Sequence, residues 1–122
     1  MKLKDKVCIV TGATSGMGKA IAKGLSSEGA KLILSGRNQE RGMALEEVLD
    51  NAVFISGDIT DPSYNKKLVD TAIETFGKLD ILSLNAGILG IGNVQELSIE
   101  SWQKTINTNL SSIFYLCKYA LP

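Results

Sequence analysis

The segment Thr11-Gly12-Ala13-Thr14-Ser15-Gly16-Met17-Gly18 has the residue types and the spacing of an anion-binding turn. An apolar run precedes it at residues 7–10 and a run with helical spacing follows it, so the pattern predicts a strand, a glycine-rich turn and a helix. The first N–H groups of such a helix have no partner inside the helix, and together with the helix dipole they favour a phosphate group. Thr14 and Ser15 add hydroxyl donors. A plain glycine-rich turn is the alternative that this segment leaves open.

The glycines of this segment have different predicted tasks. Gly12 allows the chain to turn sharply off the strand, where a positive φ favours glycine. Gly16 lets the backbone approach a bound group without an intervening Cβ, and Gly18 lets the helix lie close to the strand. The residues that we expect to form this part of a cofactor site are Gly12, Thr14, Ser15, Gly16, Met17 and Gly18.

Arg37 follows the second predicted strand, at residues 31–35. In dinucleotide-binding folds this place often holds an acidic side chain that accepts hydrogen bonds from the adenosine ribose. A guanidinium there can instead pair with a 2′-phosphate in bidentate fashion, which favours NADP over NAD as the cofactor. Two alternatives stay open, because Arg37 could be a solvated turn residue or could stack on adenine.

Two further strand ends carry polar or small residues. Asp58 closes the third predicted strand, at residues 53–55, where it could accept a hydrogen bond from an adenine amino group or simply form a turn. Asn85-Ala86-Gly87 follows the fourth predicted strand, at residues 79–84. The small residues leave room for a flat ring or a ribose. Asn85 could touch the ligand, hold neighbouring backbone together or serve only as a turn residue.

Asn109 falls in the middle of an apolar stripe on the last predicted helix. At about 100° per residue, the stripe consists of Trp102, Ile106, Ile113, Leu116 and Ala120. We expect Asn109 to be buried there, where its amide must find hydrogen-bond partners or cost stability. It then either pins the helix to backbone at the strand ends or places a water or a catalytic side chain. Burial alone favours the first.

Strand and helix signals alternate along the whole chain. Helices are predicted at residues 17–28, 39–50, 62–76 and 99–121, with Asp61 and Ser98 as N-caps and Gly29 and Gly77 as stops. The alternation predicts an α/β fold, a three-layer, doubly wound parallel sheet of the Rossmann type with strand order 3-2-1-4, in a single domain at residues 1–122. A ligand would bind at the carboxyl ends of the strands, between the first and the fourth.

The composition is that of an ordinary globular domain. Thirteen basic residues balance thirteen acidic ones, which argues against nucleic acid as a partner. The sequence has no histidine, the commonest transition-metal ligand, and we expect no metal site. Cys8 and Cys117 lie in apolar segments and are expected to be buried thiols. No run reaches the ~20 apolar residues of a membrane span, and none resembles a signal peptide, so we expect a soluble cytoplasmic protein.

Taken together, these motifs resemble the short-chain dehydrogenase/reductase family over the whole chain. Residues 11–18 are similar to its T-G-x-x-x-G-x-G cofactor motif, and Gly57-Asp58-Ile59-Thr60-Asp61 is similar to its adenine-contacting strand end. Leu84-Asn85-Ala86-Gly87 resembles its N-N-A-G segment, with Leu84 in place of the first asparagine. Asn107-Thr108-Asn109-Leu110 resembles the helix segment that bears the catalytic asparagine, and Asn109 is the matching position. Gly36-Arg37 resembles the NADP-preferring members.

The resemblance implies an oxidoreductase that transfers hydride between nicotinamide and a small carbonyl or alcohol substrate, and that assembles as a dimer or tetramer. It adds Ile59 to the expected cofactor contacts and implies that Asn109 anchors a water in a proton relay. The general likeness is to bacterial 3-oxoacyl-carrier-protein reductases and to related sugar-alcohol or steroid dehydrogenases. The sequence does not choose among these substrates.

The departure from the family's pattern is large. The resemblance implies that the family's catalytic serine and its Tyr-x-x-x-Lys pair lie beyond residue 122. Within the chain, Tyr64 has Leu68 four places on and Tyr115 has Tyr119. We therefore expect the chain to be the N-terminal, cofactor-binding half of such an enzyme, a fragment that is inactive alone. The alternative is a non-catalytic dinucleotide-binding module or an inactive fragment. The coding sequence beyond Pro122 would separate the two.

Overall fold

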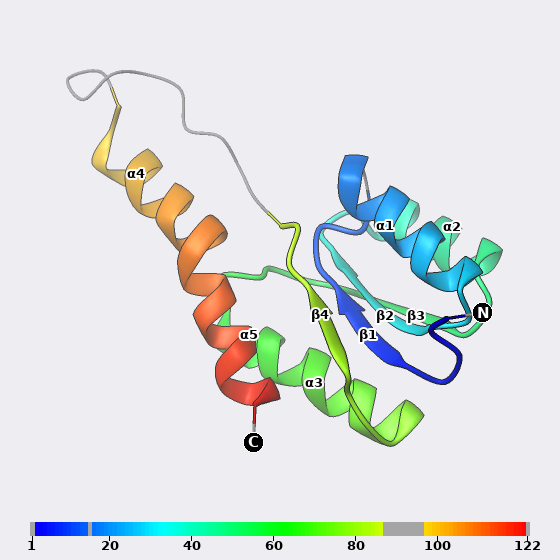
Figure 1. Ribbon diagram of the computed structural model, residues 1–122. Helices are drawn as coiled ribbons and strands as arrows, with labels where there is room; N and C mark the ends of the chain where they lie inside the picture. The colour runs from blue at the N-terminus through cyan, green and yellow to red at the C-terminus, as the bar shows by residue number, and fades with distance from the viewer. Residues whose placement is uncertain (1, 15, 87–96, 122) are drawn as a thin grey trace.

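The computed structural model of the chain describes residues 2–14, 16–86 and 97–121 (Figure 1). The strands are β1 (Val7–Val10), β2 (Lys31–Gly36), β3 (Ala52–Ser56) and β4 (Ile81–Ser83). The helices are α1 (Gly16–Ser27), α2 (Gln39–Val48), α3 (Pro62–Phe76), α4 (Ile99–Ile106) and α5 (Ser112–Ala120), with a π-helical turn, η1 (Asn107–Ser111), between the last two. Strands and helices alternate as the sequence predicts.

The strands form one parallel sheet in the order β3-β2-β1-β4, which confirms the predicted order. β1 pairs with β2 from Val7↔Lys31 and with β4 from Cys8↔Ile81, so the strand order reverses beside it. Every residue of β1 is fully buried, as expected for an apolar strand that is covered on both faces. β4 is shorter than the strand predicted at residues 79–84.

The side chains of β1 alternate between two hydrophobic clusters, one on each face of the sheet. One cluster joins Ile9 of β1 to Leu68 of α3 and Leu116 of α5. The other joins Val10 of β1 to residues of α1 and α2, among them Leu45. Figure 1 shows α1 and α2 on one side of the sheet and α3 and α5 on the other. This arrangement confirms the predicted three-layer fold.

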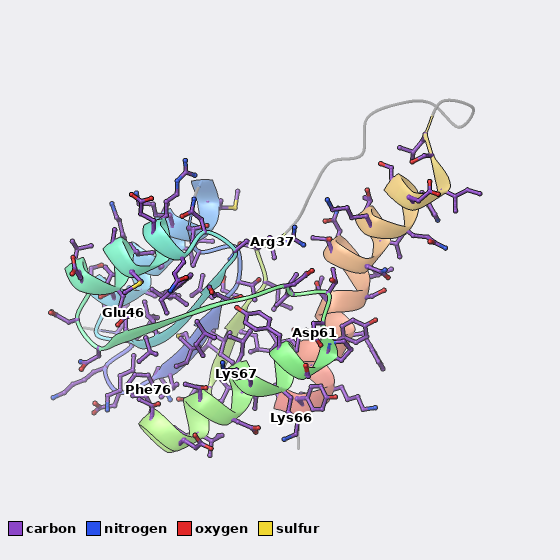
Figure 2. The ribbon with its side chains drawn as sticks, turned by 180° about the vertical axis from the view of Figure 1, so that it is seen from behind. Arg37, Glu46, Asp61, Lys66, Lys67 and Phe76 are labelled. Carbon is purple, nitrogen blue, oxygen red and sulfur yellow. The ribbon has the colours of Figure 1, made fainter. Side chains whose placement is uncertain are left out.

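Cap residues set the helix boundaries as predicted. At the start of α3 (Figure 2), Asp61 Oδ1 accepts a hydrogen bond from Ser63 N at 2.9 Å. Gly77 ends the same helix with a φ of 83°. At the start of α4, Ser98 Oγ accepts a hydrogen bond from Ser101 N at 3.0 Å. These caps fix where α3 begins and ends and where α4 begins.

The last helical stretch differs from the prediction. Its buried residues include Thr108, Ser112 and Leu116, whereas Trp102 is 56% exposed. Asn109 is exposed as well, so its predicted burial within the apolar stripe is wrong. One reason is that α4 extends past the sheet and has no buried residue (Figure 1). The other is that the wider turn of η1 changes the angle per residue, which moves later residues off a stripe drawn at about 100°.

The two cysteines are both free thiols, and only one of them is fully enclosed. Cys8 is buried, as predicted, and Cys117 is half-buried. Burial, with a smaller contribution from Asp80, raises the pKa of the Cys8 thiol, so the neutral form of this core residue is favoured. Among the helices described here, none is long and apolar enough to cross a membrane.

The turn after β1 is packed against backbone on two sides. Gly12 has a φ of 60°, and a Cβ there would come within 2.8 Å of the Asn85 backbone. A Cβ on Gly18, in the first turn of α1, would collide with the carbonyl oxygen of Gly12. Both positions need glycine, because backbone atoms cannot move aside as the tip of a side chain can. The contact holds the start of α1 against the end of β1.

Gly18→Ala should lower the free energy of unfolding by about 1–3 kcal/mol, because the added methyl group forces the turn and α1 apart. Gly24→Ala in the same helix is a matched control, since a Cβ at Gly24 meets nothing within 4 Å. There, alanine's helix propensity should stabilise the fold by about 0.5–1 kcal/mol. Urea unfolding followed by circular dichroism measures both variants. Similar effects for the two variants would contradict the close packing at Gly18.

Candidate functional site

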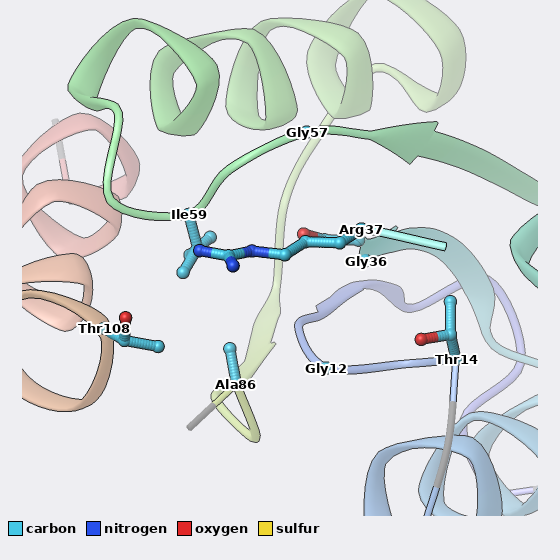
Figure 3. Close-up of a pocket in the computed structure, with 9 residues that line it drawn as sticks. Gly12, Thr14, Gly36, Arg37, Gly57, Ile59, Ala86 and Thr108 are labelled. Carbon is cyan, nitrogen blue, oxygen red and sulfur yellow. The ribbon is translucent and has the colours of Figure 1, made fainter. Parts of the chain in front are cut away.

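A pocket of about 190 Å³ lies at the carboxyl ends of the strands (Figure 3). Its lining comes from the turn after β1, the ends of β2 and β3, the segments that follow β3 and β4, and η1. The lining residues are Gly12, Thr14, Ser35, Gly36, Arg37, Gly57, Ile59, Ala86 and Thr108. The pocket lies at the edge where the sequence predicts a ligand, beside the strands at which the order reverses.

The start of α1 lies beside this pocket. The helix begins at Gly16, two residues after Thr14, and Figure 3 shows its first turn next to Thr14. Gly16 has a φ of 58°, and a Cβ there would meet nothing within 4 Å, so space is open at this end of the helix. Unpaired N–H groups at a helix start, next to open space, suit an anionic group such as a pyrophosphate.

Thr11 ties the turn after β1 to the segment after β4. Its Oγ1 accepts hydrogen bonds from the backbone N–H groups of Asn85 at 2.9 Å and Ala86 at 3.1 Å. The side-chain Nδ2 of Asn85 donates to Ser83 Oγ at 2.8 Å. Thr11 thus holds the backbone here, whereas the Asn85 side chain bonds to another side chain, and the predicted role of Asn85 stays a prediction. The bonds to Thr11 also keep Ala86 in the pocket wall.

Tyr64 of α3 contacts both β2 and β3 beside the pocket. Its hydroxyl group donates to the backbone oxygen of Ile55 at 2.7 Å and lies 2.7 Å from Ser35 Oγ. A phenol has one proton, so Ser35 donates to Tyr64 in this arrangement. Burial raises the pKa of Tyr64, and the hydrogen bond with Ser35 opposes part of the rise. Tyr64 is therefore a neutral link between β2, β3 and α3.

Asn65, also on α3, holds the segment that follows β3. The residue is fully buried, and its Nδ2 donates to the backbone oxygens of Ile59 at 2.8 Å and Asp61 at 3.0 Å. Its Oδ1 has no hydrogen-bond partner in the part of the chain that the structure describes. The two bonds from Nδ2 fix Ile59, which is 7% exposed, in the pocket wall.

An ion pair joins the ends of β2 and β3 beside the pocket. Arg37 Nη2 lies 3.0 Å from Asp58 Oδ1, and both side chains are about half exposed. The same Oδ1 accepts hydrogen bonds from Thr60 N at 2.9 Å and Thr60 Oγ1 at 2.7 Å. The hydrogen bonds from Thr60, and to a smaller extent the Arg37 guanidinium, lower the pKa of Asp58. The carboxylate is therefore charged at neutral pH.

The structure brings most of the predicted site residues together. Those that line the pocket are Gly12, Thr14, Arg37, Ile59 and Ala86. Those that begin α1 beside it are Gly16, Met17 and Gly18. Asp58 does not line the pocket itself but forms an ion pair with Arg37, which does, and Asn85 precedes the lining residue Ala86. Ser15 and Gly87 lie outside the described residues.

Asn109 is not among the residues that line the pocket, whereas its neighbour Thr108 is. Thr108 is 4% exposed, and its Oγ1 has no hydrogen-bond partner among residues 2–14, 16–86 and 97–121. The π-helical turn η1 thus presents Thr108 to this pocket and leaves Asn109 exposed on the helix.

Sequence reasoning missed four residues that shape the pocket, namely Ser35, Tyr64, Asn65 and Thr108. Ser35 is a polar residue that follows a buried apolar run, a pattern that marks a strand end. Tyr64 and Asn65 lie one turn after the N-cap of α3, where side chains point back toward the preceding loop. Thr108 lies between two asparagines in the segment Asn107-Thr108-Asn109-Leu110. Each of these signals was available in the sequence.

The pKa of Asp58 should depend more on Thr60 than on Arg37. Thr60→Val removes the hydroxyl donor, which is the largest cause of the lowered pKa, and Arg37→Gln removes a smaller one. An NMR titration of the carboxyl carbon should therefore show the larger upward shift for Thr60→Val. A larger shift for Arg37→Gln would mean that the ion pair dominates.

The same shift has a consequence for stability. The folded-state pKa of Asp58 lies below the ordinary 3.8, so its charged form stabilises the fold above that value. This stabilisation is lost as the pH falls through the lowered pKa.

Comparison with known proteins reveals a family match over nearly the whole chain. The family model for short chain dehydrogenases matches residues 6–122. An uncharacterized oxidoreductase from Listeria monocytogenes is 39% identical over 129 residues, which cover 100% of this chain and 51% of the relative. The chain therefore spans about half the length of the curated relatives it matches.

Solved structures share the fold described above. A short-chain dehydrogenase/reductase from Brucella melitensis, described as a glucose/ribitol dehydrogenase, has a TM-score of 0.96 and 34% identity, covering 100% of this chain and 53% of that one. A blue fluorescent protein from a metagenomic library, solved in complex with NADPH, has a TM-score of 0.94 and 30% identity, covering 99% and 52%. The family match, the sheet order and the glycine-rich turn agree, and the chain belongs to the short-chain dehydrogenase/reductase family of oxidoreductases.

Proposed function

We propose that this chain is the cofactor-binding part of an NADP-dependent oxidoreductase that transfers hydride between nicotinamide and a carbonyl or alcohol substrate. The proposal rests on the position of Arg37, which lines the same pocket as the glycine-rich turn. A guanidinium there can pair with a 2′-phosphate, and β2 carries no carboxylate that would repel it. The NADPH complex of one structural neighbour supports this choice of cofactor.

Each part of the pocket has a proposed task. The pyrophosphate lies at the start of α1, on Gly12, Thr14, Ser15, Gly16, Met17 and Gly18. Arg37 pairs with the 2′-phosphate, while Asp58 and Ile59 contact the adenine. Space for a ribose or a flat ring is left by Asn85, Ala86 and Gly87. The bound cofactor supplies the hydride, and these residues bind and orient it. Residues 1–122 then form an NAD(P)-binding Rossmann domain, the N-terminal half of the enzyme.

Proton transfer in this proposal follows the family pattern, with a tyrosine that a lysine assists and a relay water held by Asn109. Neither Tyr64 nor Tyr115 is followed by lysine at the required spacing. The proposal includes assembly as a dimer or tetramer, which the family resemblance implies, and a cytoplasmic location, which the sequence predicts. The direct test is carbonyl-dependent oxidation of NADPH by the whole protein. Binding of NADPH without turnover on any carbonyl would favour a non-catalytic module.

Arg37→Asp should weaken the binding of NADP much more than that of NAD, because a carboxylate would then face the 2′-phosphate. A charge-assisted hydrogen bond contributes about 1.5–3 kcal/mol, so the ratio of the two affinities should change by about tenfold or more. Titration of the whole protein with NADPH and NADH measures the ratio.

The matched control is Arg41→Asp, which makes the same change of charge four residues further along the chain, within α2. Arg41 faces a different groove, between α1 and α2. It should leave the ratio nearly unchanged. Equal losses of both cofactors in Arg37→Asp would mean that Arg37 does not read the phosphate.

Asn109→Ala should lower turnover in the whole protein and leave the affinity for NADP nearly unchanged. Asn109 is exposed on the helix and is not among the pocket-lining residues, so its loss should not disturb the phosphate contacts. Melting temperature and turnover must be measured on the same variant. A strong loss of stability, with normal turnover in the surviving folded protein, would assign Asn109 a structural role instead.

A further inference from the structure

The carboxylate of Asp58 is held in place by its own loop. Its Oδ1 accepts hydrogen bonds from Thr60 N at 2.9 Å, Thr60 Oγ1 at 2.7 Å and Arg37 Nη2 at 3.0 Å. Exposed ion pairs are usually weak, partly because two side chains must be ordered to form them. Here Thr60 already orders one of the two, so only the Arg37 side chain has to be fixed when the pair forms.

The ion pair also determines where the guanidinium lies. Figure 3 shows the Arg37 side chain extended across the pocket, from Gly36 toward Ile59. In this position its charge faces the Asp58 carboxylate, with 3.0 Å between Nη2 and Oδ1. A phosphate group that approaches the end of β2 therefore meets a cation whose charge is already partly balanced.

We propose that Asp58 determines cofactor specificity through Arg37, because its carboxylate competes with the 2′-phosphate of NADP for the guanidinium and so limits the preference for NADP over NAD. The inference rests on the proposed function, in which Arg37 reads that phosphate. Binding of NADP requires the guanidinium to leave Asp58 or to be shared with it. Binding of NAD requires no such exchange, so the loss of affinity falls on NADP alone.

The exposure of the pair sets the size of the effect. The two side chains are 53% and 54% exposed, and exposed ion pairs change equilibria by about fivefold at most. Removing the carboxylate should therefore raise the ratio of NADP to NAD affinity by about two- to fivefold. Thr60→Val keeps the charge but removes one hydrogen bond to Oδ1, so it should raise the ratio by less.

The experiment compares the dissociation constants of NADPH and NADH for the whole protein at one ionic strength, by fluorescence titration. The variants are Asp58→Asn, Thr60→Val, Arg37→Gln and the double variant of Asp58 and Arg37. NADPH and NADH carry the same adenine, so any change in the contact between residue 58 and its amino group cancels from the ratio, and asparagine also keeps a carbonyl oxygen for that contact. Glu40→Gln is the matched control, since it removes a negative charge from the first turn of α2, outside the pair.

We expect Asp58→Asn to raise the ratio about two- to fivefold, Thr60→Val to raise it by less, and Glu40→Gln to leave it nearly unchanged. Once Arg37 is glutamine, Asp58→Asn should have no further effect on the ratio. A damaged fold cannot produce this result, because it would not improve the affinity for one cofactor selectively.

Three results would overturn the inference. An equal rise with and without Arg37 would mean that the carboxylate repels the phosphate directly. An unchanged or lower ratio in Asp58→Asn would mean that the carboxylate does not compete, or that it orients Arg37 for the phosphate. If Arg37→Gln by itself leaves the ratio unchanged, the proposed NADP preference fails and the inference fails with it. The proposed function and this inference can also be told apart. If Arg37→Gln lowers the ratio of NADP to NAD affinity but Asp58→Asn does not raise it, the proposed function holds and the competition by Asp58 is excluded.

Discussion

The contact of backbone on backbone in the turn after β1 is the constraint on which the pocket depends. Gly12 lies against the Asn85 backbone on one side, and its carbonyl oxygen fills the space that a side chain at Gly18 would need. Thr11 Oγ1 strengthens the same contact by accepting hydrogen bonds from the backbone N–H groups of Asn85 and Ala86. These contacts place the start of α1 and the segment after β4 relative to each other. They leave no room for a side chain at Gly12 or Gly18.

The opposite wall of the pocket is held by side chains instead of close backbone contact. Tyr64 and Asn65 reach from α3 to backbone oxygens of β3 and of the loop after it, and so fix Ile59. Arg37 and Asp58 then join β2 to β3 across the surface. One wall is thus held by close backbone contacts, whereas the other carries the Arg37 guanidinium, which is paired with Asp58. In the proposed function, the first wall would hold the pyrophosphate and the second would distinguish NADP from NAD.

The sequence predicted the sheet order and the strand ends well, because apolar runs, caps and glycines are local signals and right-handed crossovers allow few topologies. It also placed Gly12 and Arg37 at strand ends, the family resemblance added Ile59, and in the structure all three line one pocket. It failed for Asn109, since a projection at constant angle cannot anticipate the π-helical turn η1 or an α4 that extends past the sheet. The pairing of Arg37 with Asp58 was also not predicted, because it depends on how two side chains of different loops orient.

Hydrogen–deuterium exchange of the whole protein, with and without NADPH, tests the central claim that this edge of the sheet is the dinucleotide site. NADPH should slow exchange in residues 12–18 and 57–60. The groove at the other end of the sheet, which includes Asp50 and Asn51, should exchange at the same rate in both states. NADPH binding that leaves residues 12–18 unprotected, or that protects Asp50 and Asn51 instead, would contradict the assignment of the site.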